Sequence, residues 1–480
     1  MNFKMNVNND KEKMLIESEL KKLNITKKNY SPINNHENCY NPDDKKLWCK
    51  ECVPRYIIEG WTSENHDIDK FIKETIYNAK YYYDDYYNGD SYSNDDIKDS
   101  NFPIFLEWVP FDNFENIKQI GEGGFAKVYS AIWINGRSKY DKQDDGSWEK
   151  RESEPMRVAL KRLNNSQNIS AEYLNELKTH WNYNKLQCDV LKFYGMTKDP
   201  ETKEFMMIIE FSEKGNLRSF LLNDFINITW EDKIYFLSKL SYDLQSLHKL
   251  GYCHKDFHSG NILQIYDDEV ESYVTYISDF GLSGPSNKQK TDVKICGVLP
   301  YIAPEVLNGE PYTFSSDIYS FGVIMTELSS GKPPFYKRKH DINLALEICN
   351  GLRPEFGKGT PEIYKKLAYK CMSANPDQRP TADELYEVLY FWYSYDQEKK
   401  FGYEGKEIRD MFEKADKEIP NISTLYEKDP DAIYTGRVFT FGYLSKPINS
   451  SVITSYLSDE SDNKGCQDSQ LIELEVSSSL

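Results

Sequence analysis

The chain has 480 residues and a formal net charge of −18 at neutral pH, with 28% charged and 39% hydrophobic residues. This length can bury one large core or two to three ordinary ones, and the acidic balance argues against broad binding to nucleic acid or anionic membranes. No apolar run approaches the roughly 20 residues of a membrane helix, and the first residues lack the apolar core of a secretory signal. We therefore expect a cytoplasmic or nuclear chain, whose nine cysteines stay reduced.

A candidate metal segment lies near the amino terminus. His36 and Cys39 form one pair of possible ligands, and Cys49 and Cys52 form a second pair with the same two-residue gap. Such spacing in a reduced chain predicts a structural Zn²⁺ knuckle with a Cys₃His ligand set over residues 36–60. The alternative is a chance cluster, and the surroundings are not basic enough to favour nucleic-acid binding by this segment.

Other parts of the chain are weakly patterned. Residues 1–35 are rich in Asn and Lys and are predicted to form a flexible arm. Residues 61–103 begin with a helical pattern and continue as an acidic, Tyr-rich linker, and the charged insertion near residues 136–155 is predicted to be a surface loop. The polar residues 394–480 are predicted to be a largely disordered acidic tail.

Between these parts the composition is that of a folded domain. Strand patterns with turn signals fill its first part, and helical patterns dominate after Leu217. A strand-rich half followed by a larger helix-rich half predicts an α+β fold with two lobes. The strand patterns cover residues 116–133, 156–163 and 203–212, and the helical patterns cover residues 170–184, 230–251, 317–331, 361–372 and 382–395.

A glycine-rich turn joins the first two predicted strands. Gly121, Gly123 and Gly124 allow the backbone to approach a ligand without a Cβ clash, so its N–H groups could cover phosphate oxygens. The turn lacks the following helix of a Rossmann fingerprint and the Gly-Lys-Ser/Thr of a Walker loop. Taken alone, such a turn is more often a tight hairpin than a nucleotide site.

A lysine and a glutamate are expected to pair near this turn. Lys161 ends an apolar strand, and Glu176 lies fifteen residues later inside a predicted helix. An ion pair between them would hold a charged amine beside phosphate in a partly dry cleft. Glu172, one turn earlier, is the rival partner; Glu176 is favoured because its neighbouring leucines can pack the helix against the sheet.

The stretch CHKDFHSGNIL, residues 253–263, supplies further polar groups. Asp256 can accept a hydroxyl proton, while Asn261 and the later Asp279, which precedes Phe-Gly, offer the oxygen ligands that Mg²⁺ prefers. Glycine turn, lysine, glutamate, Asp-x₄-Asn and Asp-Phe-Gly occur in the order and spacing of a phosphoryl-transfer site.

The two histidines of this stretch allow another interpretation. His254 and His258 have the spacing of half a zinc site on a helix. The following Ser-Gly-Asn is typical of a loop, so we expect His254 to pack beneath the loop and donate to a backbone carbonyl.

Taken together, these motifs resemble the eukaryotic protein kinase family over residues 114–393, closest to the tyrosine-kinase-like group of serine/threonine kinases. The resemblance implies a bilobal fold, with a β-rich N-lobe carrying one regulatory helix and a mainly α-helical C-lobe. YIAPE resembles the kinase Ala-Pro-Glu motif, and its Glu305 would form a buried ion pair with Arg379. Asp317 would form hydrogen bonds with the backbone of the catalytic loop, which contains Asp256.

The resemblance also implies an adenine site and protein substrates. The backbone around Glu210 and Ser212 would form hydrogen bonds with adenine. Ile209 matches the gatekeeper position, and Gly215 would allow the turn of the hinge, the segment that joins the two lobes. The apolar positions that match those around the ring are Val128, Ala159 and Leu263.

Several residues depart from the family pattern. Ala126 replaces the third glycine of the loop, and Lys255 replaces the arginine before the catalytic aspartate. Lysine cannot make the bidentate contact to a phosphorylated activation loop, which puts control by loop phosphorylation in doubt. His258 replaces a lysine common in serine/threonine kinases, and Val298 replaces a threonine.

We therefore expect a kinase that transfers the γ-phosphate of Mg-ATP to serine or threonine hydroxyls of proteins. Lys161 would position the α- and β-phosphates, Glu176 would hold Lys161, and Asp256 would orient the hydroxyl and take its proton. The alternatives are a catalytically weak or inactive pseudokinase scaffold, or a tyrosine or dual-specificity kinase. The protein substrate and the oligomeric state stay open.

Overall fold

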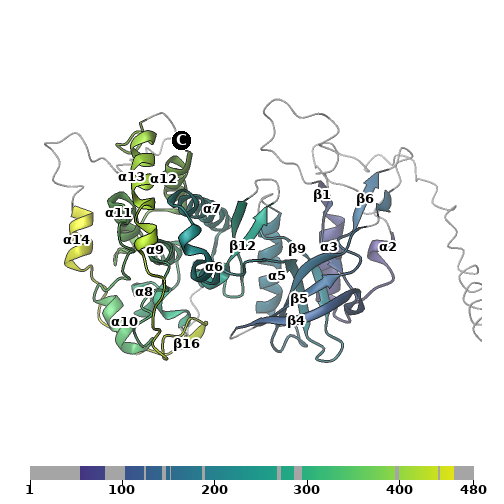
Figure 1. Ribbon diagram of the computed structural model, residues 1–480. Helices are drawn as coiled ribbons and strands as arrows, with labels where there is room; N and C mark the ends of the chain where they lie inside the picture. Colours follow the sequence, from purple (N-terminus) through teal and green to yellow (C-terminus); the bar gives the residue numbers. More distant parts are fainter. Residues whose placement is uncertain are drawn as a thin grey trace, which may run out of the picture. The chain divides into compact units, whose positions relative to one another are not determined.

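The chain divides into two compact units. The first contains residues 1–106 and 135–154, and the second contains residues 107–134 and 155–480. The computed structural model (Figure 1) describes residues 55–81, 103–123, 126–142, 148–151, 153–185, 190–267, 272–285, 295–394, 399–441 and 444–458.

The first unit is built around helix α3 (His66–Tyr77). Asn65 caps this helix because its side chain accepts hydrogen bonds from two backbone N–H groups of the first turn. Phe105 packs against Tyr140, with ring centroids 5.9 Å apart. The insertion that we predicted as a surface loop is thus partly a β-hairpin in the same unit as α3. The other elements are α2 (Arg55–Ile58), the antiparallel pair β1 (Lys80–Tyr81) and β2 (Pro103–Ile104), and the hairpin β6 (Lys139–Lys142) and β7 (Trp148–Arg151).

The second unit begins with a sheet whose strand order is β3-β9-β10-β8-β5-β4. The β3–β9 pair is parallel and the other pairs are antiparallel. Helix α5 (Ala171–Asn184) follows β8, and Ser170 caps it by accepting a hydrogen bond from the N–H of Tyr173. The strands are β3 (Glu107–Trp108), β4 (Phe114–Glu122), β5 (Ala126–Trp133), β8 (Met156–Leu163), β9 (Phe193–Lys198) and β10 (Phe205–Glu210).

The rest of this unit is mainly helical, as the sequence predicted. Its helices are α6 (Leu217–Asp224), α7 (Trp230–Lys249), α8 (Pro304–Leu307), α9 (Phe314–Ser330), α10 (Ile342–Cys349), α11 (Glu362–Cys371), α12 (Ala382–Ser394), α13 (Gly405–Asp416) and α14 (Ser451–Ser458). Short antiparallel pairs join β11 (Tyr252–Cys253) to β14 (Gly284–Pro285), β12 (Ile262–Asp267) to β13 (Ser272–Ile277), and β15 (Ile295–Gly297) to β16 (Arg437–Phe439).

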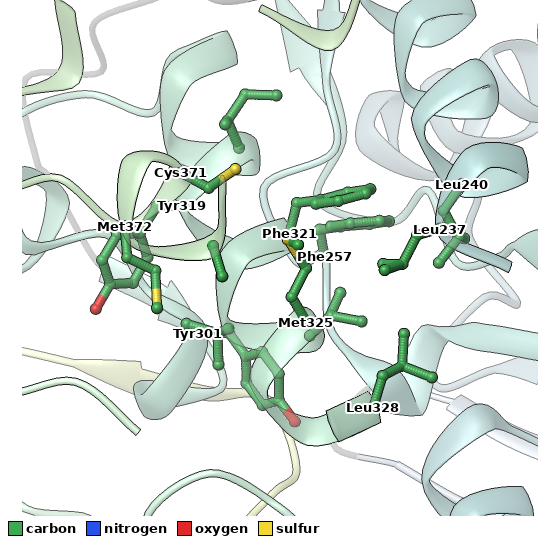
Figure 2. Packing of buried hydrophobic residues seen from close by; sticks show 14 of the residues in the cluster. Leu237, Leu240, Phe257, Tyr301, Tyr319, Phe321, Met325, Leu328, Cys371 and Met372 are labelled. Carbon is green, nitrogen blue, oxygen red and sulfur yellow. The ribbon is translucent and has the colours of Figure 1, made fainter. Parts of the chain in front are cut away.

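Helix α9 forms the centre of the helical core. A capping box at Thr313 begins it, and every residue from 316 to 329 is buried, as expected of a helix that is packed on all sides. Figure 2 shows Phe257, from the stretch 253–263, stacked on Phe321 of α9 with ring planes 11° apart. The same core therefore supports the polar stretch that carries Asp256.

The prediction of a largely disordered tail is wrong for residues 399–441 and 444–458. These residues carry α13, β16 and α14, and isolated apolar side chains fix them to the C-lobe. Phe412 of α13, for example, is buried and stacks on Trp230 with ring centroids 5.7 Å apart. Because such anchors are far apart in a polar sequence, composition alone did not reveal them. Ser394 is the last residue of α12, and the other residues of the predicted tail lie outside the described residues.

Candidate active site

A charged cluster joins the sheet, α5 and the segment after β13. The amine of Lys161, on β8, lies 2.7 Å from Oε1 of Glu176 on α5 and 2.8 Å from Oδ1 of Asp279. The structure thus pairs Lys161 with Glu176, the partner that the sequence favoured over Glu172. Three residues from separate parts of the chain meet at one amine.

The electrostatics of this cluster keep its central groups charged. Burial disfavours the charge on Lys161, but the carboxylates of Asp279 and Glu176 outweigh burial and raise the pKa of Lys161. The side chain of Asp279 is only partly buried; burial still disfavours its charge, yet Lys161 lowers the pKa of that carboxyl to about 2. For Glu176, burial is the largest influence and raises the pKa. At neutral pH Lys161 is therefore an ammonium and Asp279 a carboxylate.

The stretch 253–263 holds Asp256 and Asn261 close together. The amide of Asn261 donates to the carbonyl oxygen of Asp256 at 3.0 Å and to its Oδ2 at 3.3 Å. Oδ1 of Asp256 is buried and has no hydrogen-bond partner within the described ranges. Asn261 also accepts hydrogen bonds from the backbone and side chain of Ser278, the residue before Asp279. Asn261 therefore holds one carboxylate oxygen of Asp256, and the other oxygen makes no hydrogen bond to any residue that the structure describes.

Asp317 of α9 fixes the backbone of this stretch. Its carboxylate accepts hydrogen bonds from the N–H groups of His254 at 2.8 Å and Lys255 at 2.9 Å, as the resemblance implied. Lys255 has a φ of +69°, an uncommon conformation for a residue with a side chain. The buried carboxylate stabilises this conformation and so positions the following Asp256.

The two histidines of the stretch do not form a zinc pair. Nε2 of His254 lies 3.1 Å from the carbonyl oxygen of Ser278, which is the packing role that we expected. Nδ1 of His258 accepts the N–H of Gly260 at 3.0 Å, so the neutral ring carries its proton on Nε2, 3.6 Å from Oδ2 of Asp256. Both rings are thus held by backbone groups.

The strand register places the candidate nucleotide residues on one face of the sheet. Val128 pairs with Lys161, and Ala159 lies two positions before Lys161 on the same strand. Residues two apart on a strand, and residues paired across strands, share a face. Gly121 pairs with Val128 and Ile209 pairs with Ala159, so both join this face. The face leads from the glycine turn to the gatekeeper position.

The turn and the hinge frame that face. The N–H of Gly123 bonds to the carbonyl oxygen of Ala126 at 2.8 Å, and Gly124 lies outside the described residues. At the hinge, Gly215 has a φ of +70°, which favours glycine, and the hydroxyl of Ser212 donates to its carbonyl oxygen at 2.8 Å. The backbone of Glu210 leads into the hinge, and Leu263 forms a β-bridge with Asn216 just beyond it.

The predicted buried ion pair is present. Nη1 and Nη2 of Arg379 each lie 2.7 Å from an oxygen of Glu305, a bidentate geometry. Arg379 also donates to the carbonyl oxygens of Ser373 and Ser315, each at 2.8 Å. The pair ties the Ala-Pro-Glu segment to the loop before α12.

A second buried network was missed by sequence reasoning. Glu327 of α9 accepts hydrogen bonds from Ser259 at 2.9 Å and from the hydroxyl of Tyr301 at 2.6 Å. Arg218 of α6 donates to the same hydroxyl at 3.3 Å. No local pattern links these four residues, because they come from four separate segments.

The metal ligands predicted from sequence fall into two groups. Asn261 lies beside Asp256, and the side chain of Asp279, which contacts Lys161, remains 41% exposed, which suits a hard cation that keeps waters and phosphate ligands. No group of three or more His, Cys, Asp or Glu side chains suited to a metal occurs among the residues that the structure describes. His36, Cys39, Cys49 and Cys52 lie outside them.

No helix within the described ranges is both long and apolar enough to cross a membrane.

Comparisons with known proteins agree with this geometry. Residues 114–389 match the family model described as protein tyrosine and serine/threonine kinase. Two probable serine/threonine-protein kinases of Dictyostelium discoideum are 26% and 28% identical to the chain, over 274 and 281 residues, and the matches cover 56% and 58% of the chain and 15% and 28% of those proteins. The probable serine/threonine-protein kinase gdt4 of the same organism is 28% identical over 284 residues, 58% of this chain and 16% of its own length. The chain thus matches less than a third of each relative, and by its family match it belongs to the protein tyrosine and serine/threonine kinases.

Proposed function

We propose that the chain is a protein kinase that transfers the γ-phosphate of ATP to serine or threonine hydroxyls of proteins, and that it belongs to the tyrosine-kinase-like group. The observation that carries this proposal is the contact of Lys161 with both Glu176 and Asp279. A kinase needs this arrangement because the amine must reach the phosphates while the aspartate faces the metal. The names of the relatives support serine and threonine as acceptors.

Each residue has a distinct part in the reaction. Lys161 binds the α- and β-phosphates, and Glu176 holds its amine in place. The free Oδ1 of Asp256 accepts the hydrogen bond of the attacking hydroxyl and takes its proton. Asn261 and Asp279 would hold Mg²⁺ bound with ATP, and the ion would supply positive charge at the phosphate oxygens. Most of the rate enhancement comes from positioning and charge stabilisation.

The test is transfer of labelled γ-phosphate to a generic protein substrate. The wild-type chain should label serine or threonine, whereas Asp256→Asn and Lys161→Met should lose at least about 10²-fold in rate. Equal labelling by all three proteins would instead indicate an inactive scaffold. Identification of the labelled amino acid separates serine/threonine from tyrosine specificity.

Residues 36–60 are proposed to form a structural zinc knuckle, and the protein to act in the cytoplasm or nucleus. The support for zinc is the matched spacing of His36–Cys39 and Cys49–Cys52. Elemental analysis of the gently purified chain should find about one zinc per molecule, and Cys49→Ser should lower that content. A chain free of zinc would remove the proposal.

A further inference from the structure

The edge of β15, beside Asp256, is covered by the chain's own C-terminal segment. Ile295, Cys296 and Gly297 of β15 pair with Phe439, Val438 and Arg437 of β16. A Cβ at Gly297 would lie 3.3 Å from Oδ1 of Asp256. Since Arg437 is the strand partner of Gly297, the register brings the stretch that ends at Arg437 next to the proposed proton acceptor.

Tyr434 anchors the segment on the other side of this position. Its carbonyl oxygen accepts a hydrogen bond from Arg218 at 3.3 Å, and its ring lies 4.6 Å from the Arg218 guanidinium. Nη1 of Arg218 would lie 3.6 Å from a Cβ placed at Gly260, which belongs to the same loop as Asp256. The hydroxyl of Tyr434 donates to the carbonyl oxygen of Pro334 at 2.9 Å. Only Thr435 and Gly436 separate this anchor from Arg437.

The buried His340 adds three more attachments. Its N–H donates to the carbonyl oxygen of Asp431 at 3.1 Å, and its Nδ1 lies 2.9 Å from the carbonyl oxygen of Ile433. Nη2 of Arg437 donates to the carbonyl oxygen of His340 at 3.1 Å. Residues 431–439 are therefore held along the C-lobe by side-chain bonds to backbone carbonyls, and residues 437–439 add the strand pairing by which a sheet edge holds a peptide.

From this geometry we infer that residues 431–439 occupy the place of a protein substrate and inhibit the kinase in cis. The inference rests on the proposed function. The cluster of Lys161, Glu176 and Asp279 is already assembled, so the segment does not act by displacing these groups. It acts instead beside Asp256, where Arg437 pairs with Gly297, and so blocks the approach of a protein substrate.

Tethering makes such inhibition effective even if each contact is weak. A segment joined to its own binding site competes at an effective concentration that can reach millimolar values. If the segment alone binds with a Kd of about 0.1 mM, an effective concentration of about 1 mM raises the apparent KM of a competing protein substrate by about tenfold. Release of the segment should therefore change the KM for protein substrates more than it changes the KM for ATP.

The experiment replaces residues 433–439 of the full chain by a glycine–alanine sequence of equal length, which leaves α13 and α14 intact. The KM for a generic peptide substrate should fall by about tenfold or more, whereas ATP hydrolysis without peptide should stay unchanged. A finer pair is Val438→Pro, which breaks the strand, and Val438→Ala, which should behave as wild type because Val438 is 50% exposed. An unchanged or lower peptide activity in the replacement variant would overturn the inference.

A binding measurement separates this inference from the proposed function. A fluorescent peptide with the sequence of residues 431–441 should bind to the replacement variant and not to the wild-type chain, whose site is filled. If the peptide binds only to the replacement variant and no variant phosphorylates a protein, the inference of an occupied site is supported and the proposed kinase activity is refuted. If it binds neither protein, the occupied site is refuted whatever the activity.

Discussion

Replacing Arg379 with methionine tests the buried ion pair. The side chains of Arg379 and Glu305 are 0% and 11% exposed, and two 2.7 Å contacts join them. In the Arg379→Met variant the Glu305 carboxylate stays buried without its partner. Removing one half of such a pair costs about 3–5 kcal/mol of the free energy of unfolding, whereas an exposed pair contributes about 1 kcal/mol or less. The loss of two carbonyl contacts, at Ser373 and Ser315, acts in the same direction.

Thermal unfolding, followed by tryptophan fluorescence, measures this effect. For a domain of this size we expect the unfolding midpoint to fall by roughly 6–20 °C. The control is the double variant Arg379→Met with Glu305→Gln, which removes the unpaired charge and should regain part of the stability. A shift below about 2 °C, or a double variant less stable than the single one, would refute the reasoning.

Two further predictions concern single side chains. Glu176→Gln should lower kcat/KM for phosphate transfer by roughly 10²-fold because Lys161 loses one of its two carboxylate partners. The control Glu172→Gln should keep kcat/KM within a few fold of wild type. Similar losses in both variants would contradict the pairing of Lys161 with Glu176. His180 and His254 are buried, and burial lowers the pKa of His180 to about 3 and also lowers the pKa of His254. The unfolded chain then binds more protons below about pH 6.5, so the free energy of unfolding should fall by about 1.4 kcal/mol per pH unit from His180 alone, and His254 adds to the fall. Urea midpoints that are equal at pH 7 and 5.5 would exclude this.

Much of the candidate site was predictable because its residues occur in short motifs. Lys161, Glu176 and Asp279 each lie in a local pattern, and the order of the patterns restricted their pairing. Asp317 and the Glu305–Arg379 pair were predicted from the resemblance in the same way. These positions depend on a framework of strands and helices long enough to leave a periodic signal.

The C-terminal strand left no such signal. Residues 437–439 are too few for a strand pattern, and their partner β15 is equally short. Their pairing depends on tertiary contacts such as those of Tyr434 and His340, which no local sequence reveals. The contacts of Glu327 were missed for a similar reason, because its partners lie on separate segments.

The first unit has a practical consequence for dissecting the protein. It is discontinuous in sequence, since the hairpin of residues 135–154 returns to it from within the β4–β8 region. A fragment that starts at residue 107 would keep Tyr140, which is 5% exposed in the whole chain, but would lack Phe105 against which it packs. Such a fragment should expose the apolar surface of Tyr140 that Phe105 covers in the whole chain, and should therefore aggregate. Shortening the hairpin together with the amino-terminal deletion avoids that surface and is the better way to isolate the catalytic part.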